Sequence, residues 1–399
     1  MTWQERPLGD CVTFASGGTP NKAKPEYWNG EIPWVSSGEM SRHFIEDTSL
    51  HITEAGAEAG SRLVAAGTVF AVVRGMSLAT EFRLACAART MAFNQDVKAL
   101  TVKDGIDSYF LFSSLRAHAN QIRDLSTEAA HGTKKLEMER LASFRIPVPE
   151  VGAQRRAADV VRNYDDLIES NRRRITLLEE SARLLYREWF VNLRFPGHEQ
   201  AHFKNGLPDD WSVVPLTDVA EVNRRNLNSK AAPDSIQYVD IASVETGCVR
   251  QTAEMTFADA PGRARRLVQQ GDVIWSCVRP NRKSYALIRE PAANLVVSSG
   301  FAVLTATRVP STYLYLTTTS DAFVAFLSNR ATGAAYPAVT AKDFEAAQVL
   351  RPDHSVLQEF DDRYEPIFAL IHTLREQNKR LTLARDELLP KLMSGAIRV

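Results

Sequence analysis

The stretch AADVVRNYDDLIESNRRRITLLEESARLLYREW, residues 157–189, decides how this chain folds. A continuous seam of residues runs through it, stepping alternately by 4 and 3 positions from Ala157 to Trp189. A second seam with the same steps and the same length runs from Phe360 to Leu392. Such steps mark the a and d positions of helices that pack side by side in a coiled coil. The sequence therefore predicts two long helices, each with a seam of about 50 Å at the helical rise.

One asparagine interrupts each seam, Asn171 in the first and Asn378 in the second. An antiparallel pairing in which residue numbers sum to 549 sets the two amides opposite each other. A parallel pairing would leave both amides against apolar side chains, at a cost of about 1 to 3 kcal/mol each. We therefore expect an antiparallel helix pair with a hydrogen bond between Asn171 and Asn378. The same register sets Arg385 over the ring of Tyr164, a cation–π geometry. The alternative is that each helix packs only on its own globular domain.

The sequence that precedes each seam is also repeated. Four segments recur in the same order at offsets between 203 and 208 residues: 7–10 at 215–218, 32–35 at 236–239, 63–69 at 267–273, and 146–149 at 349–352. An ordered repeat at a nearly constant offset indicates an internal duplication. Within each copy, short β-branched runs alternate with Gly, Pro and Asn, and helices are predicted over 108–124 and 311–329.

We therefore expect an α+β fold with an internal pseudo two-fold axis, in which two similar mixed domains are separated by an antiparallel pair of long helices. The expected parts are a globular domain at 1–152, a helical region at 153–195, a second globular domain at 196–353 and a helical region at 354–399. An antiparallel pair would hold the globular domains apart and bring the two chain termini together. Two similar faces held apart suit a split site on double-stranded DNA.

Composition limits the class of protein. The chain has 399 residues, 44% of them hydrophobic, which is enough for two to three folded domains. No apolar run approaches 18 residues, so we expect a cytoplasmic protein without a membrane span. The four cysteines are scattered, which argues against structural zinc. Lys plus Arg and Asp plus Glu number 48 each, so DNA binding requires local basic clusters such as Arg263, Arg265 and Arg266.

Motifs for catalysis are weak. His198-Glu199-Gln200-Ala201-His202 has the letters of a zinc-protease helix, but Pro196-Gly197 before it and Asn205-Gly206 after it favour a linker. The chain has no GxxxxGK[ST] phosphate-binding loop and no Pro-Pro-Tyr sequence of adenine methyltransferases. These observations argue against zinc proteolysis, ATP binding by a phosphate-binding loop and adenine methylation, and we expect no cofactor in this chain.

Several motifs together resemble the specificity subunits of type I restriction-modification systems. They are Ser16-Gly17-Gly18-Thr19-Pro20, the stretch from Tyr27 to Ser36, Phe93-Asn94-Gln95, Pro147-Val148-Pro149 with Gln154, Arg194-Phe195-Pro196-Gly197, Leu207-Pro208-Asp209-Asp210-Trp211 and Leu388-Leu389-Pro390-Lys391. The chain departs from this pattern at residues 221–226, where EVNRRN replaces the Ser-Gly-Gly-Thr-Pro segment.

The resemblance implies a subunit without catalytic activity. Its two target-recognition domains, 1–152 and 196–353, would each bind one half of a bipartite asymmetric DNA site. Its helical regions would set the spacer and dock methyltransferase subunits, which use S-adenosylmethionine, and a restriction subunit, which uses ATP and Mg²⁺. The competing hypothesis is a coiled-coil scaffold that organises partner subunits without binding specific DNA.

Residues that contact DNA are expected to be polar or basic and to lie on loops. The candidates are Ser36, Ser37, Arg74, Asn94, Gln95, His131, Thr133, Lys134 and Lys135 in the first half, and Arg279, Asn281, Arg282, Lys283, Ser284 and Tyr336 in the second.

Overall fold

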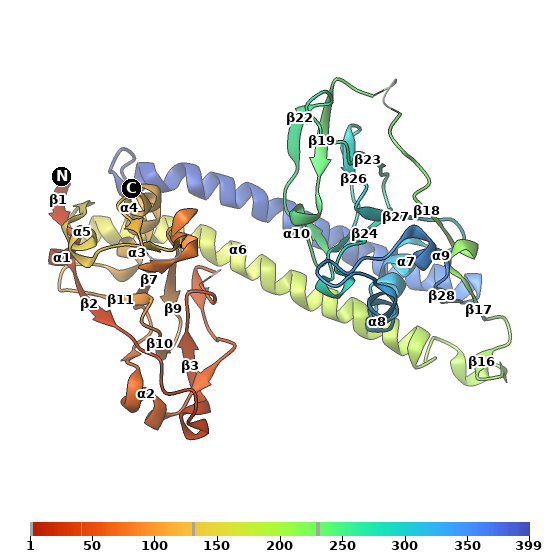
Figure 1. Ribbon diagram of the computed structural model, residues 1–399, viewed down its shortest axis with the longest axis horizontal. Coiled ribbons are helices and arrows are strands. Elements are labelled where there is room, and N and C mark those ends of the chain that lie inside the picture. Colours follow the sequence, from red (N-terminus) through yellow and green to blue (C-terminus); the bar gives the residue numbers. More distant parts are fainter. Residues whose placement is uncertain (1–2, 41, 130–131, 229–231) are drawn as a thin grey trace. The chain divides into compact units, whose positions relative to one another are not determined.

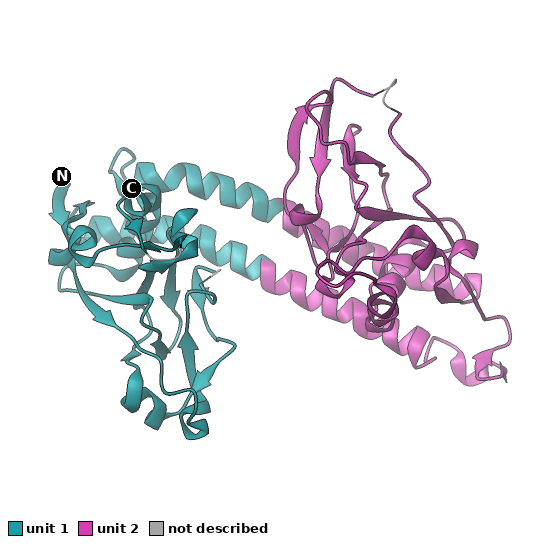
Figure 2. Ribbon diagram, in the orientation of Figure 1, with its two compact units in different colours: residues 1–171, 377–399 teal, residues 172–376 magenta. Residues whose placement is uncertain are grey.

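The computed structural model describes residues 3–40, 42–129, 132–228 and 232–399. The chain forms two compact units, residues 1–171 with 377–399 (unit 1) and residues 172–376 (unit 2), as Figure 2 shows. Each unit mixes strands and helices, which confirms the predicted α+β class. Within the described ranges, no helix is both long enough and apolar enough to cross a membrane.

Unit 1 is built on two main sheets, with strand orders β5-β3-β10-β6 and β2-β11-β7-β9-β4 (Figure 1). All four residues of β7 are buried, as its unbroken apolar run Val69–Val72 predicts for a central strand. Two smaller ladders, β1-β14 and β12-β13-β8, complete the unit. The strands are β1 Gln4–Pro7, β2 Val12–Ser16, β3 Trp28–Val35, β4 Phe44–Ile45, β5 His51–Ile52, β6 Leu63–Val64, β7 Val69–Val72, β8 Arg74–Gly75, β9 Leu84–Ala87, β10 Met91–Phe93, β11 Val97–Val102, β12 Thr127–Glu128, β13 Lys134–Lys135 and β14 Arg145–Val148.

The helices of unit 1 other than α2 pack on the β2-to-β4 sheet through one core, whereas Ala57 of α2 packs with Trp34 and Ile52 of the other sheet. Asp107 caps α3 by accepting hydrogen bonds from the backbone N–H groups of Tyr109 and Phe110. The single helix predicted over 108–124 is two helices, because the chain breaks at His118. The helical elements are α1 Leu8–Cys11, α2 Glu54–Gly60, the 3-10 turn η2 Met76–Ala79, α3 Ser108–Ala117, α4 Ala119–Asp124, α5 Met138–Ser143 and the first part of α6 Val151–Tyr186.

Unit 2 repeats most of this topology. Its sheet β22-β19-β26-β23 corresponds to β5-β3-β10-β6, and in both the second and third strands pair in parallel. Its sheet β18-β27-β24-β25 corresponds to β2-β11-β7-β9, and β17-β28 corresponds to β1-β14. The internal duplication predicted from the sequence is therefore present in the topology.

The elements of unit 2 have the following bounds. The strands are β15 Phe203–Lys204, β16 Leu207–Pro208, β17 Ser212–Pro215, β18 Ala220–Val222, β19 Ser235–Val239, β20 Val244–Glu245, β21 Cys248–Val249, β22 Ala253–Thr256, β23 Ala264–Leu267, β24 Val273–Ser276, β25 Tyr285–Leu287, β26 Leu295–Ser298, β27 Phe301–Ala306 and β28 Gln348–Arg351. The helical elements are the π-helical turn η4 Arg187–Val191, the 3-10 turns η5 His198–Gln200, η6 Leu216–Asp218, η8 Ile241–Ser243 and η9 Pro280–Arg282, α7 Ser311–Thr318, α8 Asp321–Arg330, α9 Ala341–Glu345 and the first part of α10 His354–Met393.

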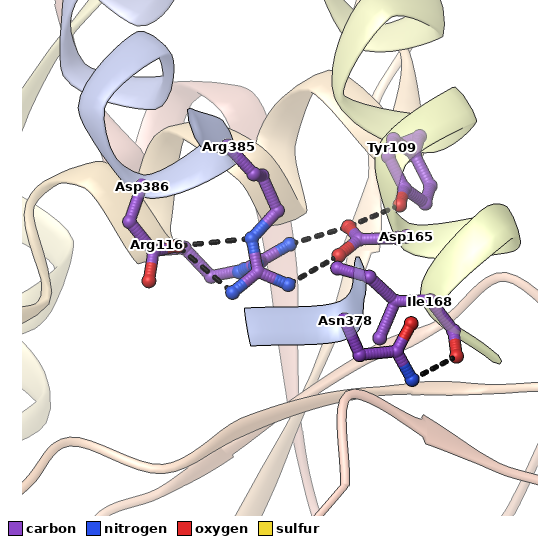
Figure 3. Close-up of polar contacts among 7 residues, drawn as sticks. All are labelled: Tyr109, Arg116, Asp165, Ile168, Asn378, Arg385 and Asp386. Carbon is purple, nitrogen blue, oxygen red and sulfur yellow. Dashed lines mark hydrogen bonds and ion pairs between the residues drawn. The ribbon is translucent and has the colours of Figure 1, made fainter. Parts of the chain in front are cut away.

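In unit 1 the first part of α6 pairs with the last part of α10 in antiparallel orientation. The Nδ2 of Asn171 donates to Oδ1 of Asn378 at 3.0 Å, so the predicted hydrogen bond is confirmed. Asn378 also donates to the backbone oxygen of Ile168 at 3.2 Å (Figure 3). Asn171 is buried, so both the orientation and the register are fixed by a satisfied buried amide pair.

The predicted contact between Arg385 and Tyr164 is wrong. Arg385 instead donates from Nη1 to Asp165 Oδ1 at 2.7 Å, and also binds Asp386 (Figure 3). The other carboxylate oxygen of Asp165 accepts from Arg116 at 2.6 Å and from the hydroxyl of Tyr109 at 2.7 Å. A buried guanidinium is stabilised more by a full negative charge than by an aromatic ring. Seam positions alone do not reveal that Asp165, the residue next to Tyr164, supplies this charge.

In unit 2 the last part of α6 packs on the first part of α10. The ring of Trp189 lies 5.6 Å from that of Phe360, which pairs the last residue of one seam with the first residue of the other. Arg375 donates to Glu179 at 2.5 Å and to the backbone oxygen of Gly247 at 2.8 Å. Helix α10 begins at His354 and continues through Pro366 to Met393.

Both ends of the described chain lie in unit 1. The Trp3 ring packs on Gly395, 2.5 Å from where a Cβ of that residue would stand, and Arg156 bonds the backbone oxygen of Val399 at 2.8 Å. The terminal segments therefore meet, as expected. The division of the chain at residues 152, 195 and 353 stays a prediction, and each unit contains part of both long helices.

Candidate nucleic-acid interface

In unit 1 the structure brings Arg74, Lys134 and Lys135 together on one small ladder. Strand β13 pairs with β8 so that Lys135 faces Arg74 and Lys134 faces Gly75. On its other side β13 pairs with β12, where Thr127 faces Lys135. Arg74 is exposed, and Lys135 forms an ion pair with Glu137 at 2.9 Å. Arg74 and Lys135 share one face of this ladder, and Lys134 points to the other face, because successive side chains of a strand alternate. These cations supply local positive charge, which phosphate contact requires.

The turn η2 follows β8 directly and begins with Met76, whose side chain is 74% exposed. Gly75 enters this turn with φ of 140°, a conformation that favours glycine. The backbone oxygen of Thr133 accepts from Ala129 at 2.8 Å, which closes the neighbouring loop. His131 was also predicted to contact DNA, but it lies outside the described residues.

The other first-half candidates lie at a second place, where the parallel strands β3 and β10 end. Ser36 and Ser37 follow β3 and are half-buried. Asn94 is buried, and its Oδ1 accepts from the backbone N–H groups of Asp96 and Val97. This gives Asn94 a role inside the fold as a turn cap. Gln95 is exposed and accepts from the hydroxyl of Thr19 at 2.8 Å.

The Ser-Gly-Gly-Thr-Pro segment packs against this same place. A Cβ at Gly17 would stand 2.1 Å from the backbone oxygen of Phe93, and one at Gly18 would stand 2.2 Å from that of Gly60. The N–H of Gly18 donates to Phe93 at 2.9 Å. The two glycines are therefore needed for close approach of backbones. The motif positions the loop that carries Thr19 and, through it, Gln95.

In unit 2 the second-half candidates gather on one turn, η9. Arg279 and Lys283, on either side of it, have φ of 51° and 55°, which L-residues rarely adopt. Each is held by a partner: Arg279 donates from Nη2 to the backbone oxygen of Ala335 at 2.9 Å, and Lys283 binds Asp321 at 2.9 Å. The hydrogen bond from Lys283 lowers the pKa of Asp321. The turn exposes Asn281 and Arg282.

Tyr336 belongs to the same corner of unit 2. The Arg279 guanidinium lies over its ring, 4.5 Å from the centroid, while 69% of the tyrosine remains exposed. A cavity of about 430 Å³ opens beside the turn and is lined in part by Arg263, Arg279, Arg282 and Ser284. Arg263 also donates to the hydroxyl of Tyr238 at 3.1 Å. The sequence shows the basic cluster of Arg263, but no local pattern places it beside this turn, because the two are separate segments of the chain.

The amino-terminal part of the chain can now be compared with known families. A sequence model of the family described as the type I restriction modification DNA specificity domain matches residues 1–180. Residues 1–180 belong to this family. This specificity domain comprises the globular part of unit 1, with the Arg74 ladder, and most of α6. The resemblance stated from the sequence is thereby confirmed.

Relatives extend the similarity beyond the specificity domain. The type I restriction enzyme MjaIX specificity subunit of Methanocaldococcus jannaschii is 24% identical over 100% of this chain and 94% of its own. The EcoR124I/EcoR124II specificity subunit of Escherichia coli is 29% identical over 41% of each chain. A crystal structure of a type I restriction-modification S subunit from M. genitalium aligns with a TM-score of 0.62 at 13% identity, covering 98% of this chain and 96% of that one. The chain shares the fold of that subunit.

The zinc-protease pattern lies beyond the specificity domain. His198 begins the single 3-10 turn η5, and Ala201 is already extended, with φ of −75° and ψ of 136°. The two histidines therefore do not share one face of an α-helix, which that motif requires. Among the described residues, no group of three or more His, Cys, Asp or Glu side chains is placed to hold a metal ion.

Proposed function

We propose that this chain is the DNA-recognition subunit of a type I restriction-modification enzyme and that it binds a bipartite asymmetric site. Each unit would contact one half-site. The chain itself would carry no catalytic group and no cofactor. It would act in the cytoplasm and dock methyltransferase subunits, which use S-adenosylmethionine, and a restriction subunit, which uses ATP and Mg²⁺.

The observation that carries this proposal is that one topology occurs twice with different side chains at the same ladder. In unit 1 the ladder carries Arg74, Lys134 and Lys135. In unit 2 the corresponding bridges join Val278 to Ala338 and Ala338 to Thr332, and the cations instead lie on the adjoining turn. Two copies of one fold with different polar surfaces suit two half-sites of different sequence.

The long helices support docking of partner subunits. Several of their leucines are exposed in the isolated chain, and exposed apolar side chains along a helix are the usual anchors for a partner helix. They are Leu167, Leu177 and Leu184 on α6 and Leu370 and Leu383 on α10.

Methylome sequencing of cells that express this chain with its methyltransferase subunit tests the proposal. The expected result is one methylated motif with two specific parts of different sequence and a non-specific spacer. A complex that assembles but methylates no defined motif would instead support the scaffold alternative. A gel shift with the co-expressed complex gives an independent result, because a scaffold produces no sequence-specific band.

A further inference from the structure

The turns η2 and η9 occupy the same position in the two units. In unit 1, Arg74 pairs with Lys135, Lys135 pairs with Thr127, and η2 begins two residues after Arg74. In unit 2, Val278 pairs with Ala338, Ala338 pairs with Thr332, and η9 begins two residues after Val278. Each turn therefore follows the corresponding paired residue, which lies in a three-stranded ladder in unit 1 and in two isolated bridges in unit 2.

The two turns expose opposite chemistries. In unit 1, Met76 is exposed at the start of the turn and Leu78 is completely buried beneath it. In unit 2, Pro280 is buried at the start of the turn, and Asn281 and Arg282 are exposed. The outward face is thus apolar in the first unit and hydrogen-bonding in the second, although the backbone element is the same.

Both turns are held by contacts with neighbouring segments, and such preorganisation favours binding. In unit 1, Arg123 donates to the backbone oxygen of Thr80 at 3.1 Å, just beyond the end of η2. In unit 2, the two left-handed residues beside η9 are fixed by their bonds to Ala335 and Asp321. Strained backbone that is held by surrounding contacts is concentrated at functional sites.

We propose that these two turns recognise bases in the major groove, and that Met76 contacts a thymine methyl group in one half-site while Arg282 binds a guanine in the other. Thymine is the base that presents a methyl group in the major groove, and it is contacted by apolar side chains. Guanine O6 and N7 accept two hydrogen bonds from a guanidinium, the commonest specific contact of arginine. The proposal rests on the proposed function, because it assigns one base to each half-site.

The first experiment compares methylomes of the assembled methyltransferase complex carrying Met76→Ala, Arg282→Ala or Arg282→Lys. Met76→Ala should relax one A·T position in one half-site, and Arg282→Ala one G·C position in the other. Arg282→Lys should also relax the G·C position, because lysine keeps the charge and loses the planar fork. Leu50→Ala and Arg308→Ala, which alter exposed residues of the same two units, should leave the motif unchanged.

The second experiment measures binding of synthetic duplexes by the same complexes. Uracil in place of the thymine removes one methyl group and should weaken wild-type binding about fourfold. 7-Deazaguanine in place of the guanine removes the N7 acceptor of the proposed contact. On the unmodified duplex, Arg282→Ala should weaken binding by roughly 5- to 150-fold. Uracil should have almost no further effect on binding by Met76→Ala, and 7-deazaguanine almost none on binding by Arg282→Ala, because the contact is already lost in each variant.

The two proposals fail in different ways. If the wild-type complex yields no bipartite motif, the proposed function is wrong. If the motif is bipartite but Arg282→Ala leaves every position intact, or 7-deazaguanine weakens wild type and Arg282→Ala equally, the assignment of the turns is wrong. The modified duplexes are tested on the wild-type complex too, so poor folding of a variant does not prevent a decision.

Discussion

At the scale of single residues, the buried carboxylate of Asp165 is the centre of a network of ion pairs and hydrogen bonds in unit 1. Its carboxylate binds Arg116, Arg385 and Tyr109, and its side chain is 3% exposed. We predict that Asp165→Asn will lower the free energy of unfolding by about 3 to 5 kcal/mol, because Arg116 then remains buried without a counter-charge and Arg385 keeps only the exposed carboxylate of Asp386. Denaturant unfolding of the full chain measures this. Asp386→Asn is the matched control. The Asp386 side chain is 55% exposed, so this substitution should lower the free energy of unfolding by under about 1 kcal/mol.

Asp165 also gives unfolding a defined pH dependence. Burial alone would raise the pKa of this carboxyl, but the Arg116 charge and the hydrogen bonds from Arg116 and Tyr109 hold the pKa below its ordinary value. Its contribution to stability is therefore complete above the unfolded-state pKa of about 3.9 and disappears as the pH falls through the lower folded-state value. Wild type should lose stability relative to Asp165→Asn over that acidic range. Parallel pH curves for the two proteins would contradict the assignment.

What the sequence reveals at this scale depends on the kind of contact. The hydrogen bond between Asn171 and Asn378 is predictable, because each residue interrupts a regular seam and matched positions in two seams define a partner. The ion pair of Arg385 with Asp165 is not predictable in this way. Arg116 and Tyr109 also bind that carboxylate, and they lie on α3, far away in the sequence. The stacking of Arg279 on Tyr336 likewise depends on the geometry of a loop, and loops have no periodic sequence pattern from which it could be predicted.

At the scale of elements, the asparagine pair sets the register of α6 against α10 in unit 1. We predict that Asn171→Leu will destabilise the chain by about 1 to 3 kcal/mol, because Oδ1 of Asn378 loses its donor in a partly buried position. Replacing both residues by leucine should recover that loss, because no polar group is then left unpaired. Thermal unfolding of the two single variants and the double variant measures the coupling. Additive losses in the double variant would mean that the two amides do not stabilise each other.

Long elements were predictable and short ones were not. The helices show their seams over many turns, and the buried strand β7 shows an apolar run. Strands β8 and β13 contain two residues each, too few for any alternation to be recognised. Arg74 is therefore a separate candidate from Lys134 and Lys135 in the sequence, and only the pairing of β8 with β13 places them on one ladder. The parallel pairs β3-β10 and β19-β26 join residues far apart in sequence, and no local pattern indicates them.

At the scale of the whole molecule, the formal charge is zero, with 48 basic and 48 acidic side chains. A neutral protein gains little from long-range attraction to DNA, so affinity must come from local basic sites such as the Arg74 ladder. Loss of one cation there should change affinity and leave sequence preference untouched, whereas loss of Arg282 should change preference. The two kinds of variant therefore separate positioning on the phosphate backbone from recognition of bases.

Lys134→Ala tests the positioning role. If Lys134 contacts one phosphate, its loss should weaken binding of cognate and scrambled duplexes by the same factor. It should also reduce the slope of log affinity against log salt by about 0.9, because one fewer counterion is released on binding. Fluorescence anisotropy with the assembled complex over a salt series gives both quantities. Lys204→Ala, which alters an exposed lysine of the β15-β16 hairpin, should leave the slope unchanged. If Lys134→Ala keeps the wild-type slope, or weakens only the cognate duplex, Lys134 does not position the chain on a phosphate.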